Sequence, residues 1–523
     1  MTFTQLIVFI LIIQVIHFLG TWKLYKRAGR SAWQAAIPIY NAVILMRIIQ
    51  RPTWWVILLF LPIINLIMFP VIWVETARSF KKSSTLDTWL CVLSLGFYLY
   101  YINYFTTEEY AGKRELNAQS KGAETLSSVL FAVVAATIVH TYFMQPFTIP
   151  TSSLEKSLLV GDFLFVSKFH YGAKTPQTPI AFPMVHDSIP LIGVKSYVSD
   201  VQLPYFRLPG FQEVERNDIV VFNWPVDTVR KFFDTSGKHY YKPIDKKSNY
   251  VKRAVAIAGD SVAVVDGYVH VNGKQIDLPE RAKPQFSYMV QGKGKGFNPD
   301  YLRSRYNITD GISLYNKELD QYYVKAMTEE SMQNFMNQPN VETVTRLISP
   351  TTYKDDRIFP NNKKQVWNHD QMGPIYIPKA GETVQLTPES FGFYQRAIEV
   401  YEGEEMGVEQ KMSVKGDLVY INDKAVKDYT FKQNYYWMMG DNRHNSEDSR
   451  YWGFVPETHI VGKPVFIWLS IDPHASGLNK IRWDRMFTTV SGEGERTSYL
   501  PYFLILVLLI TGYRTFKKRK GKS

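Results

Sequence analysis

Five long stretches without a charged residue constrain this chain more than any other feature. They cover residues 1–22, 52–74, 88–107, 125–144 and 497–513. A helix that crosses a bilayer needs about 20 apolar residues, with ~17 as the short limit, so the last stretch is just long enough. Buried core helices are the alternative for any one stretch, but five of them predict a multi-span membrane protein. The first stretch lacks a basic n-region and a small-residue cleavage site, so we expect a retained anchor rather than a cleaved leader.

The charge distribution predicts how these spans are oriented. The chain has 60 Lys and Arg against 48 Asp and Glu, a net charge of +12. Basic residues without acidic partners lie between the first two stretches and in the C-terminal tail: Lys23, Lys26, Arg27, Arg30, Arg47 and Arg51, then Arg514, Lys517, Lys518, Arg519, Lys520 and Lys522. The positive-inside rule places both groups in the cytoplasm. Residues 145–498 then lie outside the cytoplasm, and we expect a lipid bilayer rather than nucleic acid as the partner. The loop with Arg78, Lys81 and Lys82 fits this arrangement poorly, because five spans place it outside.

The extracytoplasmic part reads as mainly β. Short β-branched or aromatic runs occur at 163–166, 218–222, 250–257, 262–265, 418–421 and 464–469. Asp266-Gly267 and Asn272-Gly273 are two-residue hairpin signals. Residues 277–412 are instead rich in Asn, Gln and Tyr, with helical character near 327–336, and read as an inserted subdomain. Cys91 is the single cysteine, which excludes an intramolecular disulfide framework and a Cys-rich zinc site.

We therefore expect a multi-span α-helical membrane region plus a mainly-β extracytoplasmic domain with a large α/β insert. The expected boundaries are a membrane region at 1–124 with spans at about 3–20, 54–74 and 88–105; a fourth span at 125–144; a β core at 145–276 and 413–475; an insert at 277–412; a linker at 476–498; a C-terminal span at 499–513; and a basic cytoplasmic tail at 514–523.

Three polar stretches are candidates for chemistry. In IPTSSLEKSLLVGD, three hydroxyls, Thr151, Ser152 and Ser153, follow the fourth span, although such clusters commonly cap helices or make turns. In YVKRAVAIAGD, Lys252 shares a strand face with small side chains, which leaves room for a substrate backbone but also suits a lysine that covers an exposed sheet. In MMGDNRHNSEDSRYWGFVPE, charged residues are so dense that burial requires nearly every group to be paired.

Together the stretches resemble the type I signal peptidases, the leader peptidase family of membrane-anchored serine peptidases with a Ser–Lys dyad. The boxes IPTSSLEKSLLVGD, RNDIVVFNWP, YVKRAVAIAGD and GDNRHNSEDSRYWGFVPE occur in the family's order. The last box reads G-D-N-R-x-x-S-x-D-S-R without a gap and is the most specific. The resemblance covers residues ~145–275 and ~415–470. It does not extend to the first three spans, the insert or the fifth span.

The resemblance implies a role for seven residues. They are Ser153 as nucleophile, Lys252 as general base, Thr151 as an oxyanion-hole hydroxyl, Ser446 as a hydroxyl that holds the lysine, and Asp441, Asp448 and Arg450 as structural ion-pairing residues near the site. Four positions depart from the family pattern: Thr151, Ser152 and Leu154 stand where the family has serine, glycine and methionine, and Lys156 stands where it has proline. The spacing to Gly161-Asp162 favours Ser153 over Ser152 as the nucleophile.

The chemistry of lysine supports this assignment. An unperturbed lysine with a pKa of ~10.4 is only about 0.04% neutral at pH 7. Burial among apolar groups lowers the pKa of a lysine and makes it a competent base. His444 and His170 are the rival bases, and for both we expect a packing or surface role. No other catalytic or metal-binding motif stands out, and the family implies no cofactor.

The resemblance implies a peptidase that removes N-terminal signal peptides from translocated preproteins, after small residues at positions −1 and −3. Its partners are then secretory preproteins, the lipid bilayer and, as a candidate, the protein-translocation machinery. Its location is the cytoplasmic (inner) membrane, multi-pass, with the catalytic domain on the periplasmic face. Two alternatives stay open from the residues alone: a non-catalytic membrane scaffold that binds proteins, and a regulatory membrane peptidase of narrow specificity.

Overall fold

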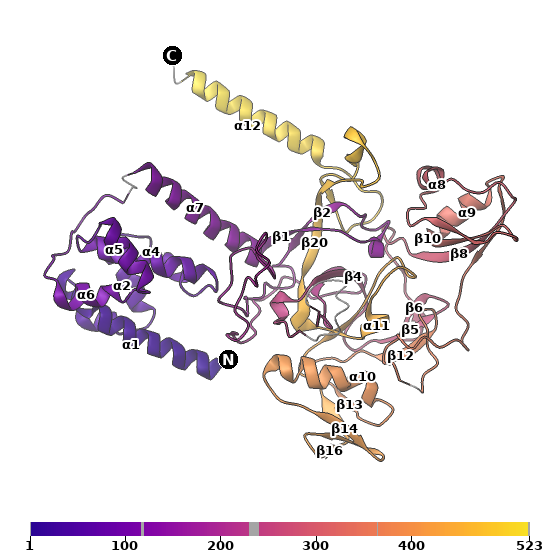
Figure 1. Cartoon of the computed structure of the whole chain (residues 1–523), viewed down its shortest axis with the longest axis horizontal. Coiled ribbons are helices and arrows are strands. Elements are labelled where there is room, and N and C mark those ends of the chain that lie inside the picture. Colours follow the sequence, from indigo (N-terminus) through magenta and orange to yellow (C-terminus); the bar gives the residue numbers. More distant parts are fainter. Residues whose placement is uncertain (1, 117–119, 230–239, 363, 521–523) are drawn as a thin grey trace. The chain divides into compact units, whose positions relative to one another are not determined.

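The computed structural model describes residues 2–116, 120–229, 240–362 and 364–520, shown in Figure 1. The chain forms two compact units. The helical unit contains Met1–Phe143, Lys174–Leu208 and Tyr241–Lys246. The sheet unit contains Met144–Ala173, Pro209–Tyr240 and Lys247–Ser523.

Seven α-helices are described in the helical unit. They are α1 Phe3–Arg27, α2 Tyr40–Ile48, α3 Trp55–Leu58, α4 Ile64–Ser79, α5 Thr85–Leu93, α6 Tyr98–Phe105 and α7 Lys121–Ile138. Within the described part of the chain, three helices are long and apolar enough to cross a membrane: Phe3–Arg27, Lys121–Phe143 and Leu500–Arg519, the last of which lies in α12 of the sheet unit. Their lipid-type side chains, such as Phe9, Phe131 and Leu508, are exposed, as expected for helices whose solvent is a bilayer.

The apolar run at 54–74 does not form the single span that we expect from its hydropathy. It divides into α3 and the start of α4, with Pro62 between them. Proline has no N–H to donate and disfavours helix at the residue before it, and Ile63 takes a positive φ of 71° where α4 begins. Beyond the run, α4 carries the buried Glu75, which pairs with Arg51, Arg78 and Arg114.

The run at 88–105 is apolar enough for one crossing, but it is broken and fits either a bent span or a re-entrant loop. It forms α5 and α6, whose axes are bent by 116°. Leu95 and Gly96 make the bend with φ of 51° and 85°. A Cβ at Gly96 would lie 2.6 Å from the Trp73 indole, so this turn needs glycine for both conformation and space. Both apolar runs, 54–74 and 88–105, are therefore divided between two helices.

The sheet unit is built on one large antiparallel sheet with strand order β1-β2-β20-β3-β4-β18-β19, and β21 pairs with β20. Its strands are β1 Met144–Thr148, β2 Asp162–Ser167, β3 Ile219–Asn223, β4 Asn249–Ala256, β18 Tyr435–Met439, β19 Val455–Pro456, β20 Ile460–Ser470 and β21 Thr488–Thr489. A short helix, α11 Ser449–Trp452, follows β18, and α12 Leu500–Lys520 follows β21. The sheet brings together segments that are more than 300 residues apart, since Asp162 pairs with Ser470.

Smaller sheets complete the unit. One sheet is β12 Met372–Tyr376, β5 Ser261–Val265, β6 Tyr268–Val271 and β7 Lys274–Gln275; another pairs β13 Thr383–Gln385 with β17 Asp428–Thr430; a third is β14 Met412–Lys415, β15 Leu418–Ile421 and β16 Lys424–Val426. The strands expected at 163–166, 218–222, 250–257, 262–265, 418–421 and 464–469 are confirmed by β2, β3, β4, β5, β15 and β20. Asp266-Gly267 and Asn272-Gly273 make the expected tight turns, with positive φ at all four residues.

Residues 277–412 contribute two different structures. The first is a four-stranded sheet of β8 Gln285–Gly292, β9 Ile312–Asn316, β10 Gln321–Thr328 and β11 Val341–Arg346, with α8 Pro299–Tyr306 and α9 Glu329–Met336. This part has its own core, which includes Val290, Leu302 and Phe335, and forms a separate cluster of elements in Figure 1. The second part includes α10 Phe391–Arg396 and shares a core with β5 and β18, where Tyr394 packs with Val262 and Trp437.

Candidate active site

The serine turn, residues 151–154, follows β1 directly. Ser152–Leu154 form one 3-10 turn, because Leu154 and the following Leu158 are drawn into the core beside Ile149 and Val221. This anchoring leaves Thr151 exposed and extended, with Ser152 partly buried. Ser153 is buried, with 8% of its surface exposed.

The two serines of the turn differ in their hydrogen bonds. The Ser152 hydroxyl accepts a hydrogen bond from Asn445 Nδ2 at 2.9 Å. The Ser153 carbonyl accepts one from the Asn442 backbone N–H at 3.1 Å. Within the described residues, no hydrogen bond engages the Ser153 hydroxyl. Ser152 is therefore tied into the structure by its side chain, and Ser153 only by its backbone.

Lys252 is a buried lysine in β4, between β3 and β18. It is 3% exposed, and its ammonium lies 5.7 Å from the centroid of the Tyr250 ring. Burial lowers the pKa of Lys252 to about 8, although the carboxylates of Asp448 and Glu447 act in the opposite direction. In the described part of the chain no hydrogen bond or ion pair holds the ammonium. β4, the strand that carries Lys252, contacts the serine turn.

The loop of residues 440–448, here the GDN loop, contacts both the serine turn and β4. A Cβ on Gly440 would be 2.5 Å from the Ser153 carbonyl oxygen and 2.3 Å from Ser446 Oγ. The missing side chain at Gly440 thus allows Ser153 and Ser446 to approach each other. Ser446 Oγ is buried and has no hydrogen-bond partner in the described structure, which leaves it available to a neighbouring group.

Two bidentate ion pairs fix the GDN loop. Asp448 accepts from Arg450 Nε and Nη2, both at 2.9 Å, and also accepts the Gly440 N–H at 3.1 Å. Asp441 accepts from Arg253 Nε at 2.8 Å and Nη2 at 2.7 Å. Burial acts to raise the pKa of each carboxyl, but the paired guanidinium outweighs it and the pKa of both Asp441 and Asp448 is lowered. Because Arg253 follows Lys252 in β4, the Asp441 pair joins the loop to the strand of the lysine.

Lys156, at the position where the resemblance leads us to expect proline, has a φ of 72°. Proline is restricted to φ near −65°, so the backbone here has a different turn from one that proline would make. Its ammonium donates to Asn307 Oδ1 and Thr309 Oγ1, each at 2.9 Å, and lies 3.8 Å from Glu155. Burial lowers the pKa of Lys156 to about 8 as well.

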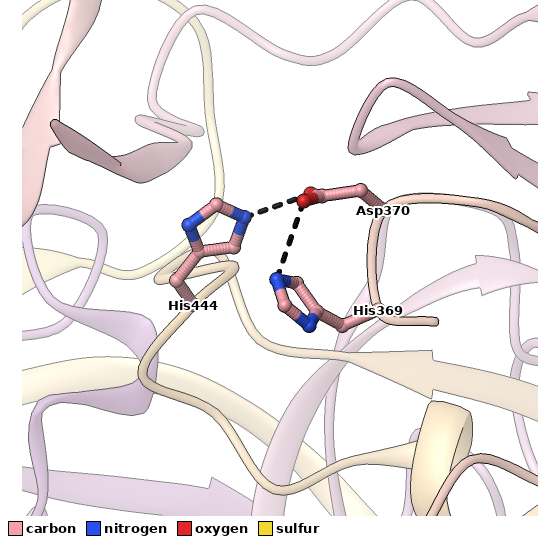
Figure 2. A group of neighbouring side chains, drawn as sticks. All are labelled: His369, Asp370 and His444. Atoms are coloured by element: carbon pink, nitrogen blue, oxygen red, sulfur yellow. Dashed lines mark hydrogen bonds and ion pairs between the residues drawn. The ribbon is translucent and has the colours of Figure 1, made fainter. Parts of the chain in front are cut away.

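A third cluster joins His369, Asp370 and His444, the types of residue that bind metals. Figure 2 shows the Asp370 carboxylate between the two imidazole rings. His444 Nε2 is 2.8 Å from Asp370 Oδ1, and His369 Nε2 is 3.2 Å from Asp370 Oδ2. His444 Nδ1 accepts the Ser287 backbone N–H at 3.0 Å, so the ring proton lies on Nε2 and is donated to Asp370. This tautomer has no lone pair facing a metal, and the donor set fits a hydrogen-bonded latch better than a metal centre.

The other histidine considered as a base, His170, contacts Ser167 Oγ at 2.5 Å and stacks on Phe169. Burial lowers the pKa of His170. The hydrogen bonds of His170 and His444 both lead away from the serine turn, to Ser167 and to Asp370. Both histidines therefore have local packing partners, as the sequence predicts.

Sequence comparison decides the family. The profile of the family described as signal peptidase, peptidase S26, matches residues 122–345 and 380–469, which is more than half of the chain. The match includes most of residues 277–412, so the expectation that the resemblance stops at this insert is wrong. The chain belongs to the S26 signal peptidase family. It is a serine peptidase. Residues 33–113 match a second family, whose function is unknown.

Curated relatives of this S26 peptidase carry the name signal peptidase I. The protein from Buchnera aphidicola subsp. Schizaphis graminum is 25% identical over 350 residues, 66% of this chain and 75% of the relative. The Helicobacter pylori protein is 26% identical over 378 residues, 70% of this chain and 92% of the relative. The Haemophilus influenzae protein is 23% identical over 390 residues, 72% of this chain and 78% of the relative. Apolar helices such as α1, α7 and α12 fit the membrane association of such peptidases.

Several residues of the S26 site are not identified by sequence reasoning. Arg253 pairs with Asp441, and only its place beside Lys252 in the motif could have singled it out. Asn442 and Asn445 bind the serine turn, although the family motif gives no role to either residue. Asp310 lies in the insert and accepts from both asparagines, a contact that no sequence signal predicts.

Proposed function

We propose that this S26 peptidase cleaves N-terminal signal peptides from translocated preproteins, with Ser153 as nucleophile and Lys252 as general base. One observation carries the proposal: Lys252 is a buried amine without a salt-bridge partner in the described structure, with a pKa lowered to about 8, on a strand that contacts the serine turn. A lysine with this pKa is about one-tenth neutral at pH 7, roughly 200-fold more than an unperturbed lysine.

In the proposed reaction, the neutral Lys252 amine takes the proton from Ser153 Oγ, which attacks the scissile carbonyl carbon. The Ser153 N–H and the Thr151 hydroxyl stabilise the oxyanion of the tetrahedral intermediate. The lysine then gives the proton to the departing amine, and an acyl-enzyme remains. Water, deprotonated by the same lysine, hydrolyses the ester. The orphan hydroxyl of Ser446 is well suited to accept a hydrogen bond from the Lys252 ammonium during these steps.

The proposed substrate binds in extended form, as an added strand, with small residues at positions −1 and −3. The start of the sheet unit at Met144, directly after the apolar segment Lys121–Phe143, supports a substrate whose cleavage site lies just beyond a membrane-embedded segment. The free Ser153 hydroxyl and the complete GDN loop favour this function over a non-catalytic scaffold. The name signal peptidase I that the relatives carry favours general preprotein processing over a narrow regulatory role.

Cleavage of a preprotein with an Ala-x-Ala site tests the proposal. We expect detergent-purified wild type and Ser152→Ala to cleave it, and Ser153→Ala and Lys252→Ala to be inactive. Loss of activity in Ser152→Ala but not in Ser153→Ala would reassign the nucleophile by one residue. Folded wild type that cuts a single membrane protein and no general preprotein would replace this function with the narrow one.

We also propose that three helices, α1, α7 and α12, cross the cytoplasmic membrane, and that α3–α4 and α5–α6 are hairpins on its cytoplasmic side. Three spans and five spans both place the sheet unit outside the cytoplasm, because the number of crossings between an outside N-terminus and this unit is even in both schemes, two or four. The three-span arrangement additionally places Arg78, Lys81 and Lys82 inside, as the positive-inside rule requires. This removes the conflict that the five-span interpretation leaves at that loop.

A further inference from the structure

A short segment of the insert contacts the active-site region around the serine turn. The insert loop, residues 307–310, follows α8, and Asn307 ends that helix in the left-handed conformation with φ 57°. Ile308 anchors the loop in the core of the insert, where it is 2% exposed. The polar side chains on either side of Ile308 all reach residues of the active-site region.

On one side, the insert loop binds Lys156, the second residue after the serine turn. Lys156 donates to both Asn307 Oδ1 and Thr309 Oγ1 at 2.9 Å. Its side chain is only 6% exposed, so these contacts replace water rather than compete with it. The left-handed backbone at Lys156 and its bonds to the insert occur at the same residue, which is where this chain departs from the family's proline.

On the other side, Asp310 orients the two asparagines that hold the serine turn. Its Oδ2 accepts from Asn442 Nδ2 at 2.5 Å and from Asn445 Nδ2 at 3.0 Å. The same Asn442 amide donates to the Ser152 carbonyl at 3.1 Å, and the Asn445 amide donates to the Ser152 hydroxyl at 2.9 Å. A carboxylate accepts only, so Asp310 fixes both amides with their NH₂ groups toward Ser152.

We propose that the insert loop is a positioning element for the nucleophile: Asp310, through Asn442 and Asn445, and Lys156, through Asn307 and Thr309, hold the serine turn in its reactive geometry. This inference rests on the proposed role of Ser153. Asp310 is a positioning residue and not a catalytic one, because it acts only through the two amides. The insert is thereby part of the active-site architecture.

The physical reason is the sensitivity of attack geometry to small displacements. Ser153 has no side-chain hydrogen bond among the described residues, so its hydroxyl is placed only by the backbone of its turn. That backbone is held by amides whose orientation depends on Asp310. A displacement of about 1 Å in such a system costs up to ~100-fold in rate. Loss of Asp310 should therefore lower kcat while substrate binding elsewhere on the sheet persists.

The test compares Asp310→Ala with Asp310→Asn and with Asp300→Ala. Asp300 is an exposed acid of α8 in the same subdomain, whose ion pair with Arg303 is solvent-exposed, and it serves as the matched control. We expect kcat for an Ala-x-Ala preprotein to fall about 10- to 100-fold in Asp310→Ala, with KM changed by about twofold or less. Asp310→Asn keeps an acceptor oxygen and should retain kcat within about threefold of wild type. Asp300→Ala should match wild type.

Two further readouts separate positioning from folding. The melting temperature of Asp310→Ala should match that of Asp300→Ala, and the pH midpoint of activity should stay at its wild-type value. Amide hydrogen exchange of residues 152–158 should be faster in Asp310→Ala than in wild type, and unchanged in Asp300→Ala. Lys156→Met should also speed exchange in this segment.

Unchanged kcat in Asp310→Ala would overturn the inference while leaving Ser153 as the nucleophile. Equal losses of kcat and of melting temperature in Asp310→Ala and Asp310→Asn would overturn it in favour of a purely structural role. If wild type cleaved no preprotein, the proposed function would fail, and the exchange experiment would still decide whether the insert loop holds the serine turn. Exchange of residues 152–158 that is equal in all variants would show that it does not.

Discussion

Lys156 follows Ser153 by three residues, and Lys252 lies on the strand that contacts the serine turn. Burial lowers the pKa of both lysines to about 8. Their surroundings give them different roles. The Lys156 ammonium donates hydrogen bonds to two side chains of the insert and lies near Glu155. These partners stabilise its charged form. Lys252 faces a tyrosine ring and has no such partner in the described part of the chain. A lowered pKa alone therefore does not identify the base, and the difference in hydrogen-bond partners supports the proposal of Lys252 for that role.

The pKa of Lys252 predicts the pH dependence of cleavage. Burial disfavours the ammonium and lowers its pKa to about 8, and only the neutral amine can take a proton from Ser153. We expect kcat/KM to fall about tenfold for each pH unit below 8 and to level off above it. Measurement of kcat/KM from pH 5.5 to 9.5 checks this, with melting curves across the range to exclude unfolding. A midpoint near the unperturbed lysine value would contradict the burial argument.

The backbone at Lys156 predicts that proline is not tolerated there, although the family pattern has it. Lys156 has φ 72°, which the pyrrolidine ring cannot reach. We expect Lys156→Pro to destabilise the protein by about 3 kcal/mol or more. Lys156→Gly accepts the positive φ and loses only the side-chain contacts, so its loss should be smaller. Denaturant unfolding of both variants measures the difference; equal stability would show that the turn can rearrange.

At the scale of elements, the short motifs and the alternating strands can be predicted from the sequence, because the residues that determine them are neighbours in the chain. The strand at Ser261–Val265 and its Asp266-Gly267 turn depend on neighbouring residues only. The partners of the active-site residues are not local. Asp310 meets Asn442 across more than 130 residues, and Arg253 meets Asp441 across almost 190. Such pairs depend on strand order, which hydrophobic patterning does not specify.

The broken helices show a different limit of sequence reasoning. Hydropathy over 54–74 and 88–105 measures only how apolar a segment is, and both segments are apolar. The signals that divide them are Pro62 and Gly96, single residues that act on the backbone. Weighing these residues together with hydropathy would have predicted that both runs are broken.

The hydrogen bond between His444 and Asp370 predicts that the protein does not respond to metal ions. Because the Ser287 N–H fixes the proton of His444 on Nε2, the cluster in Figure 2 should not bind Zn²⁺ in the native state. We expect EDTA to leave cleavage activity unchanged, and micromolar Zn²⁺ to leave the melting temperature within about 1 °C of the metal-free value. His444→Asn is the control for any residual effect. A rise in melting temperature with Zn²⁺ that His444→Asn abolishes would establish a metal site instead.

At the scale of the whole molecule, membrane placement follows from counting crossings and basic residues together. Among the described residues, α1, α7 and α12 have the length and composition of spans, whereas α3 and α6 are too short to cross a bilayer alone. Hydropathy by itself gives five crossings and leaves Lys81 and Lys82 outside. Helix lengths support the proposed three crossings, an arrangement in which every basic cluster near the spans faces the cytoplasm.

The single cysteine makes this topology testable. In a Cys91→Ser background, Lys81→Cys places a reporter in the exposed connection between α4 and α5, and Asp300→Cys places one in the insert. We expect a membrane-impermeant maleimide, applied to intact spheroplasts, to label Asp300→Cys and to leave Lys81→Cys unlabelled until the membrane is opened. Labelling of Lys81→Cys from outside would restore the five-span arrangement, in which the loop faces away from the cytoplasm. Labelling of neither variant in intact spheroplasts would place the sheet unit in the cytoplasm, which is incompatible with any scheme in which Ser153 meets translocated preproteins.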